Sequence, residues 1–230
     1  MGIKVDNYTD IPENIKRVRG VVAEAAIKSG RAPEEIILVA ASKTKPAGMI
    51  KEAIAAGVDA VGENRVQEML EKAAGGAFIG APLHFIGTLQ SNKAGKVVGA
   101  CDLIESVGSR ALLELIGRKA VSLGIVQNVL IEVNIAGEAS KHGIVPEEVL
   151  EFAEQVIQLP SIAVHGLMTM GPADATESQR RNYFEKMAQL HQDLNKIAQA
   201  RFLSMGMSGD YEAAIECGAN IVRIGRGIFG

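Results

Sequence analysis

Residues 36–56 read IILVAASKTKPAGMIKEAIAA, in which an apolar run, a short polar turn and a helical pattern follow one another. The run Ile36–Ala41 is continuously hydrophobic, which is typical of a parallel strand that is covered on both faces. Pro46 begins the following segment, at a position where the first turn of a helix tolerates proline. The stretch therefore predicts a strand, a turn and a helix, the repeating unit of an α/β fold.

This unit recurs along the whole chain. Helices are expected, for example, at Pro46–Ala56, Ser109–Leu123, Pro146–Gln158 and Glu177–Gln199. Strands are expected at Ile36–Ala41, Val58–Gly62, Leu83–Gly87, Leu103–Ser106, Val129–Asn134, Ala163–Met168, Arg201–Gly206 and Ile221–Gly225. Eight strands in 230 residues predict a (β/α)8 TIM barrel near the lower end of its usual size. No linker rich in Pro and Ser interrupts the pattern, so residues 1–230 are expected to form a single domain.

The last predicted strand is followed only by Arg226–Gly230, which is too short for an eighth helix of the usual kind. Asn14–Lys28 has an amphipathic pattern, and we expect this N-terminal helix to complete the outer ring of the barrel. The alternative architecture is an open, doubly wound sheet. Because no GxGxxG motif follows the first strand, the barrel is the favoured fold.

The composition, with 47% hydrophobic and 22% charged residues, describes an ordinary globular chain. A formal net charge of −3, no Trp, three Tyr and six Phe argue against a nucleic acid partner, since they indicate neither a basic surface nor a stacking platform. No secretory signal opens the chain, and its longest uncharged stretch, 73–92, is broken by glycines and Pro82, so no membrane span is expected. Cys101 and Cys217 lie far apart, which favours a reduced, cytoplasmic protein.

Two further absences in the sequence concern metals and assembly. The four histidines show neither the HxxxH nor the HExxH spacing, so no metal site is predicted. No coiled-coil pattern is present, and a monomer is therefore expected.

In a barrel of this kind, functional groups gather at the carboxyl ends of the strands. The turn Gly225-Arg226-Gly227 follows the last strand, and Ser208 follows the strand before it. Backbone N–H groups in a glycine-rich turn can approach an anion closely, and the loops after strands seven and eight are the usual phosphate position. We therefore expect a phosphate site here, with simple turn formation as the alternative role of the glycines.

Lys43 follows the first strand and is expected at the barrel mouth, partly shielded from water. Shielding and the nearby charge of Lys45 would favour the neutral amine that a Schiff base requires. A solvated loop lysine, or a lysine that binds phosphate by its charge, is the alternative. Glu63 is a further acid or base candidate, but a lone carboxylate indicates no particular reaction.

Arg223 interrupts an apolar strand, where an unpaired cation would be costly. A buried carboxylate or the ring nitrogen of a ligand could accept its hydrogen bonds. Asn64 offers an amide to a phenolic oxygen, although capping of a turn is the commoner role of asparagine. His165 lies within a predicted strand and is expected to be a hydrogen-bonded core histidine.

Six sequence segments occur in order along the chain, and together they are far more specific than any one alone. They are LVAASKTKP (38–46), GENRVQE (62–68), HFIGTLQSNK (84–93), GLMT (166–169), SMGMS (204–208) and RIGRGIFG (223–230). This set resembles the pyridoxal-phosphate homeostasis family over essentially the entire chain. The resemblance implies a fold-type III pyridoxal-phosphate barrel, like the N-terminal domain of bacterial alanine racemase. It also implies a role in vitamin B6 and amino-acid homeostasis without an established turnover reaction.

The resemblance further implies how pyridoxal 5′-phosphate is held. Lys43 would carry the aldehyde, and Arg223 would face the pyridine nitrogen. Family members commonly carry Thr or Ser at the position of Arg226, so here the backbone N–H and the guanidinium would replace a hydroxyl contact to phosphate. The residues that the resemblance places at the cofactor are Lys43, Asn64, Met170, Ser208, Arg223, Gly225 and Arg226.

The chemistry of these residues favours a cofactor carrier over an enzyme. Arginine is not deprotonated, so a ring nitrogen facing Arg223 stays unprotonated and the cofactor is a weaker electron sink. A two-base racemase needs a second base, usually a tyrosine, and Tyr8, Tyr183 and Tyr211 lie in no motif at a strand end. A pyridoxal-phosphate-dependent racemase and a Schiff-base aldolase are the alternatives. An open barrel mouth would suit transfer of the cofactor to apo pyridoxal-phosphate enzymes.

Overall fold

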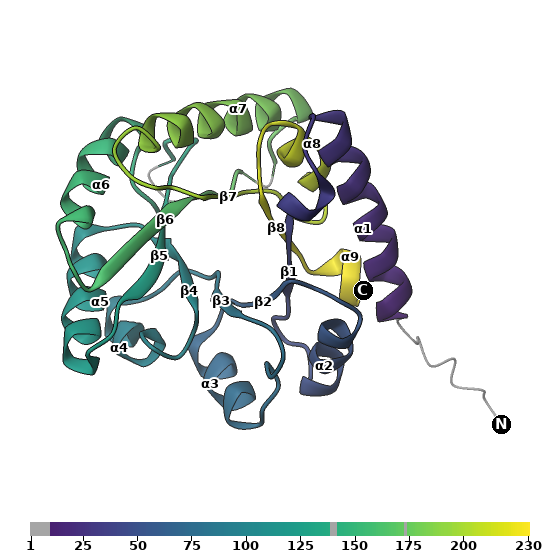
Figure 1. The fold of residues 1–230 in the computed structure, drawn as a ribbon, viewed down its shortest axis with the longest axis horizontal. Coiled ribbons are helices and arrows are strands. Elements are labelled where there is room, and N and C mark those ends of the chain that lie inside the picture. Colours follow the sequence, from purple (N-terminus) through teal and green to yellow (C-terminus); the bar gives the residue numbers. More distant parts are fainter. Residues whose placement is uncertain (1–9, 139–141, 173) are drawn as a thin grey trace.

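The computed structural model describes residues 10–138, 142–172 and 174–230. The strands of these residues are β1 (Ile37–Ala41), β2 (Ala60–Glu63), β3 (Leu83–Phe85), β4 (Leu103–Val107), β5 (Gln127–Glu132), β6 (Ile162–Met168), β7 (Phe202–Ser204) and β8 (Ile221–Ile224). They pair in parallel in chain order, and β8 pairs with β1 to close the barrel (Figure 1). The predicted (β/α)8 barrel is therefore confirmed.

Helices surround the barrel as an outer ring (Figure 1). They are α1 (Ile11–Lys28), α2 (Ala47–Ala55), α3 (Val66–Ala74), α4 (Ala94–Val97), α5 (Arg110–Leu123), α6 (Val149–Ile157), α7 (Glu177–Leu194), α8 (Tyr211–Glu216) and the single turn α9 (Arg226–Phe229). Helix α1 packs against α2, α8 and α9, so the N-terminal helix completes the ring as predicted. Asp10 caps α1 by accepting the backbone N–H of Glu13 at 3.0 Å. Among the described residues, no helix combines the length and apolar character needed to cross a membrane.

Several element boundaries differ from the predicted ones. Strand β2 begins at Ala60, because Asp59 instead accepts the backbone N–H of Leu38 at 2.6 Å, and it extends to Glu63. Strand β5 ends at Glu132, two residues early, since the next residues turn to pair with residue 144. Helix α7 ends at Leu194 because the following residues close tight turns, such as the 3.0 Å bond from Ile197 N to Leu194 O.

Alternation along the strands separates an outer core from an inner one. Leu38 and Ala40 of β1 pack toward the helices, whereas Val39 belongs to a separate apolar cluster inside the barrel. The buried members of this inner cluster are Val39, Ala60, Leu103, Leu130, Met168 and Ile221. It supplies an apolar base on which the polar groups of the site are built.

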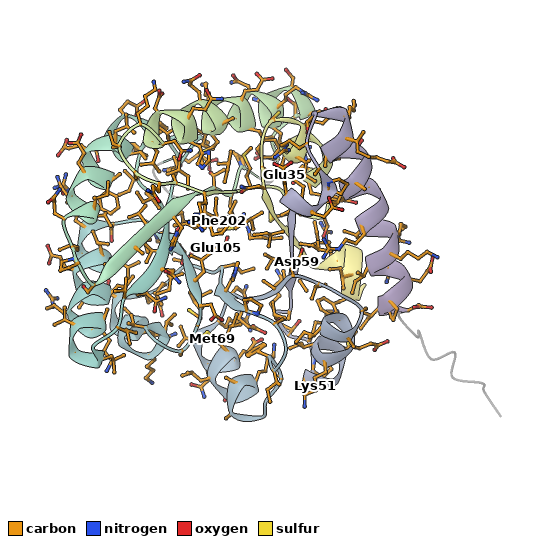
Figure 2. All side chains as sticks on the ribbon, viewed as in Figure 1. Glu35, Lys51, Asp59, Met69, Glu105 and Phe202 are labelled. Atoms are coloured by element: carbon orange, nitrogen blue, oxygen red, sulfur yellow. The ribbon has the colours of Figure 1, made fainter. Side chains whose placement is uncertain are left out.

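A polar layer lies next to the inner cluster, nearer the carboxyl ends of the strands. Glu105, Glu132, Ser204 and Arg223 are buried, and each follows a residue of the inner cluster, or Phe202 packed against it, by two positions. Side chains two residues apart on a strand share a face. Figure 2 shows Glu105 and Phe202 within the ring of strands. The barrel interior therefore changes from apolar to charged toward one end.

Candidate functional site

A cavity of about 800 Å³ opens at the carboxyl ends of the strands. Its size lies in the range of small-molecule and cofactor sites. Of the seven residues expected at a cofactor, six line this cavity, namely Lys43, Met170, Ser208, Arg223, Gly225 and Arg226. A smaller groove of about 440 Å³ beside α7 is lined by none of these residues. The predicted positions therefore come together in one place.

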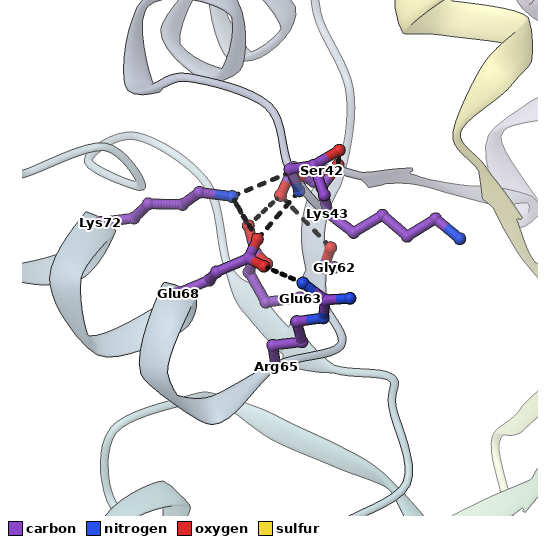
Figure 3. A network of polar contacts seen from close by, with 8 residues as sticks. Ser42, Lys43, Gly62, Glu63, Arg65, Glu68 and Lys72 are labelled. Carbon is purple, nitrogen blue, oxygen red and sulfur yellow. Dashed lines mark hydrogen bonds and ion pairs between the residues drawn. The ribbon is translucent and has the colours of Figure 1, made fainter.

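The loop that carries Lys43 is anchored by a buried ion pair beneath it (Figure 3). Glu63 is fully buried, and its Oε1 lies 2.6 Å from Lys72 Nζ and accepts the hydroxyl of Ser42 at 2.6 Å. Lys72 also donates to the backbone oxygen of Ser42 at 3.0 Å. Glu63 is thus a structural group that fixes the loop, and the acid or base role considered for it is not supported by its position.

A second set of contacts shapes the same loop. Thr44 has a φ of 61°, which is uncommon for a residue other than glycine. Its backbone N–H donates to Glu68 Oε2 at 2.9 Å, and Arg65 holds the other oxygen of that carboxylate at 3.0 Å. These bonds stabilise the backbone turn that presents Lys43.

The side chain of Lys43 extends away from this network (Figure 3). Lys43 is exposed, so the predicted partial shielding from water is wrong, because the side chain projects into an open cavity. Lys45 does not reinforce it, since its Nζ donates to the backbone oxygens of Phe229 and Gly230, each at 3.2 Å. Lys43 is left as an accessible amine on a fixed loop.

The loops after β7 and β8 meet at Ser208. Its hydroxyl accepts the backbone N–H of Gly227 at 3.2 Å, which joins the two loops. Asp210 Oδ1 accepts the N–H of Met207 at 2.7 Å and fixes the turn that carries Ser208. A Cβ on Gly227 would lie 2.8 Å from Ile224 Cγ2, so this close approach requires glycine.

The backbone N–H groups of Gly225 and Arg226 bond to no other group among the described residues. Both residues line the cavity, and Arg226 is exposed there. Unpaired N–H groups beside a serine hydroxyl form a cradle suited to an anion. The residues for which the sequence predicts a phosphate site therefore lie together at this cradle.

Arg223 is 3% exposed and lies in a bonded network across the barrel. Its Nη2 donates to the backbone oxygen of Thr169 at 2.9 Å, and its Nη1 donates to Ser204 Oγ. Glu105 Oε2 lies 3.7 Å from Arg223 Nη1 and accepts the Ser204 hydroxyl at 2.6 Å, while Glu105 Oε1 lies 2.7 Å from His84 Nδ1. The buried carboxylate of Glu105 thus lies beside Arg223, and Arg223 also lines the cavity.

These contacts set the charges of the network. Burial raises the pKa of the Glu105 carboxyl, but His84, Arg223 and Ser204 outweigh burial and leave this pKa below the usual glutamate value. Burial lowers the pKa of Arg223, with the charges of Glu105, Glu132 and Asp210 acting in the opposite direction. An arginine stays protonated in proteins, so the site keeps a permanent cation.

Asn64 follows β2 but is not among the residues that line the cavity. Its Oδ1 is buried and has no hydrogen-bond partner among the described residues. A Cβ at Gly87 would lie 2.2 Å from the backbone oxygen of Asn64, so only glycine lets the two strand ends come so close. A buried amide without a partner fits a ligand that supplies one.

Comparison with known proteins identifies the family. The sequence matches the family described as the N-terminal domain of alanine racemase over residues 12–230. The pyridoxal phosphate homeostasis protein of Escherichia coli K12 is 42% identical over 229 residues, which cover 96% of each chain. The chain belongs to the pyridoxal phosphate homeostasis family. The resemblance of the six sequence segments is thereby confirmed.

Two solved structures agree with this family and with the fold. A protein of unknown function from Bifidobacterium adolescentis is 40% identical with a TM-score of 0.90, covering 95% of this chain and 94% of that one. PipY of Synechococcus elongatus, with pyridoxal phosphate bound, is 34% identical with a TM-score of 0.83, covering 96% of this chain and 100% of that one. The predicted alanine racemase-like barrel is confirmed.

The cavity of this pyridoxal phosphate homeostasis family member also holds polar residues that the sequence analysis missed. They are Thr88, Glu132, Asn134, His142, Arg180 and Asp210. Glu132 lies at the carboxyl end of β5, and this kind of position, which pointed to Lys43, could also have identified Glu132. No comparable signal marks His142 or Arg180, which reach the cavity from a loop and a helix.

The remaining sequence candidates lie elsewhere. Tyr183 lies in α7 and Tyr211 begins α8, and neither lines the cavity, while Tyr8 lies outside the described residues. His165 is half-buried, and its Nε2 lies 2.9 Å from Asn128 Oδ1, so it is hydrogen-bonded as predicted. Burial and the charge of Arg201 lower the pKa of His165.

Proposed function

We propose that this protein binds pyridoxal 5′-phosphate, holds the aldehyde as a Schiff base on Lys43, and acts as a carrier of the cofactor and not as an enzyme. The observation that carries the proposal is one cavity that unites an accessible lysine, an anion cradle and a buried arginine. Relatives named pyridoxal phosphate homeostasis protein, and the PipY structure with pyridoxal phosphate bound, support it.

The residues present fit the parts of this cofactor. Lys43 offers a free amine on an anchored loop, as a carbonyl group requires. Ser208, with the free N–H groups of Gly225 and Arg226, suits the phosphate, and the exposed guanidinium of Arg226 adds a positive charge. Met170, which follows β6, would contact the ring, and the amide N–H of Asn64 would turn toward the phenolic oxygen.

Arg223 determines what chemistry the bound cofactor could support. Pyridoxal phosphate supplies an electrophilic carbonyl carbon and, with a protonated ring nitrogen, an electron sink. The guanidinium of Arg223 has donors only, so a nitrogen that it contacts serves as an acceptor and stays unprotonated. Glu105 and Thr169 hold the guanidinium in place. This arrangement supports binding and release over removal of an α-proton.

Amino-acid racemisation is the second candidate, because the family match is to a domain of alanine racemase. It would need a second base, and neither Tyr183 nor Tyr211 lines the cavity. Exchange of the α-proton of alanine in deuterated water distinguishes the two functions. Exchange near 1 s⁻¹ or faster, on the order of an ordinary enzyme, would contradict the carrier function.

We further propose that the carrier is a cytoplasmic monomer that delivers cofactor to apo pyridoxal-phosphate enzymes. Two widely separated free cysteines support a reducing compartment. The open cavity supports direct transfer, because an accessible Lys43 can be reached by an amine of another protein. Transfer to an apo enzyme faster than free dissociation allows would be the supporting result.

Absorbance and chemical trapping test the central proposal. The protein with pyridoxal phosphate is expected to show a Schiff-base band, and reduction with borohydride should place the pyridoxyl group on Lys43. Lys43→Ala should abolish the band. Lys45→Ala is the matched control, since Lys45 is directed to the C-terminal residues and the band should persist. Label found on Lys45 alone would overturn the assignment.

A further inference from the structure

Three buried glutamates of the barrel differ in their partners. Glu63 and Glu105 have no exposed surface, and each is bound by a cation and a serine hydroxyl. Glu132 is only 5% exposed, yet its carboxylate takes part in no hydrogen bond or ion pair with any residue that the structure describes. It lines the cavity that also holds Lys43. A buried carboxylate facing a cavity without a partner is costly unless a ligand supplies one.

The chain is folded closely around Glu132. The backbone of Ile144 donates to Glu132 O at 2.8 Å, and Asn134 N donates to Ile144 O at 2.9 Å, so residues 142–144 lie along the end of β5. A Cβ on Gly108 would lie 2.9 Å from Gly143 Cα and 3.4 Å from Glu132 Oε2. The backbone at Gly108 and Gly143 thus covers one side of the carboxylate, and its other side faces the cavity.

The charges around Glu132 also indicate its ligand. Burial raises the pKa of Glu132, while the charges of His142 and Arg223 lower it in part. Both of these residues line the same cavity, but neither lies within ion-pair distance of the carboxylate. A metal ion is disfavoured, since the described residues contain no group of three His, Cys, Asp or Glu side chains that could hold one. A compact organic cation is the ligand that this carboxylate on the cavity wall favours.

We propose that Glu132 binds the ammonium group of a primary amine that enters the cavity to exchange with Lys43. This inference rests on the proposed function, because a primary amine takes the aldehyde from a lysine by forming a Schiff base in its place. In the exchange, the ammonium gives one proton to the carboxylate, which leaves a neutral amine and a neutral acid. The amine then has the lone pair with which it attacks the imine carbon at Lys43. A C–N bond to the entering amine forms, the C–N bond to Lys43 breaks, and the neutral acid returns its proton to the departing amine of Lys43. The source of the amine is a free amino acid or the side chain of a lysine in an acceptor protein.

The variant Glu132→Gln tests this site, because it removes the charge and keeps the shape. With bound pyridoxal phosphate, it should retain the Schiff-base band of the wild type. Since the product with methylamine is also a Schiff base, the exchange is followed as loss of the pyridoxyl group that borohydride traps on Lys43. This loss should become about 100-fold slower, the usual effect of removing a general base. Glu147→Gln is the matched control, since it removes a glutamate charge from an exposed position that does not line this cavity, and it should react at the wild-type rate.

A second measurement needs no cofactor. In apo protein labelled with ¹³C at the glutamate carboxyls, methylammonium should shift one resonance, the one missing from Glu132→Gln. An unchanged resonance, together with equal rates of exchange with methylamine in Glu132→Gln and wild type, overturns the proposal. If no protein acquires the Schiff-base band, the proposed function fails, and the apo titration still decides the amine site.

Two further amines distinguish the source. Alanine and Nα-acetyllysine both carry a primary ammonium, but only alanine has a free α-carboxylate beside it. A larger dependence on Glu132 with alanine assigns the site to free amino acids, and a larger one with Nα-acetyllysine assigns it to protein lysines. No dependence with either amine contradicts the proposal.

Discussion

The polar groups inside the barrel and those at its cavity differ in how completely they are bonded. Glu105 in the interior has His84, Ser204 and Arg223 as partners. Lys43 and Glu132 at the cavity have no such partners among the described residues. Glu132 is almost as buried as Glu105, so for these two carboxylates the difference in partners is not one of burial.

The comparison indicates that the two sets of charged groups have different roles. Paired charges hold strands and loops in register, and their loss should cost stability. Charges left unbonded at a cavity lower stability and are retained where they meet a ligand. Substitutions in the first set should therefore change folding, and those in the second set should change binding.

The largest expected effect comes from Glu105→Leu. Removal of the carboxylate leaves Arg223 buried without an ionic partner, which should lower the free energy of unfolding by about 3–5 kcal/mol. The pKa of Glu105 lies below the usual glutamate value, so its contribution is present above about pH 4 and is lost as the pH falls through the lowered pKa. Urea unfolding of the apo protein between pH 3 and pH 8 measures this, and a loss that grows toward acid pH contradicts it.

Lys72→Met should break the ion pair beneath the loop of Lys43. Because it leaves Glu63 fully buried and uncompensated, we expect a loss of about 2–4 kcal/mol in unfolding free energy and weaker cofactor binding. The double variant Lys72→Met with Glu63→Leu removes both charges and should recover much of the stability. Thermal and urea unfolding of the wild type, Lys72→Met and the double variant measure these differences. A double variant no more stable than Lys72→Met would refute this explanation.

The sequence could predict the barrel because parallel strands are visible as short apolar runs such as Ile36–Ala41. It could also predict that Lys43 and Ser208 lie at the cavity, because they come in the loops after strands and their positions do not depend on register. It could not predict the partners of Glu105. Irregular pairing within β4–β5 and β5–β6 shifts the register, so the side chains that meet across the barrel are set only when it closes.

Ser208→Ala should weaken pyridoxal phosphate by about 1–3 kcal/mol through loss of a charge-assisted hydrogen bond. Pyridoxal, which lacks the phosphate, should bind both proteins almost equally. The folded state should change little, since Ser208 makes a single bond, to Gly227 N, between two loops. Titration of apo protein with each ligand measures the effect, and equal weakening of both would place the phosphate elsewhere.

The smallest expected effect has the opposite sign and comes from Glu132→Gln in the apo protein. Burial raises the pKa of Glu132, so in the folded state protonation is favoured and the ionised form is destabilising. Its folded pKa exceeds its unfolded pKa, and wild-type stability therefore falls as the pH rises between the two. Glu132→Gln should equal the wild type near pH 4 and exceed it by about 1 kcal/mol at neutral pH. Urea unfolding across this range measures the difference, and a variant less stable at neutral pH would mean that Glu132 is a bonded structural charge, like Glu105.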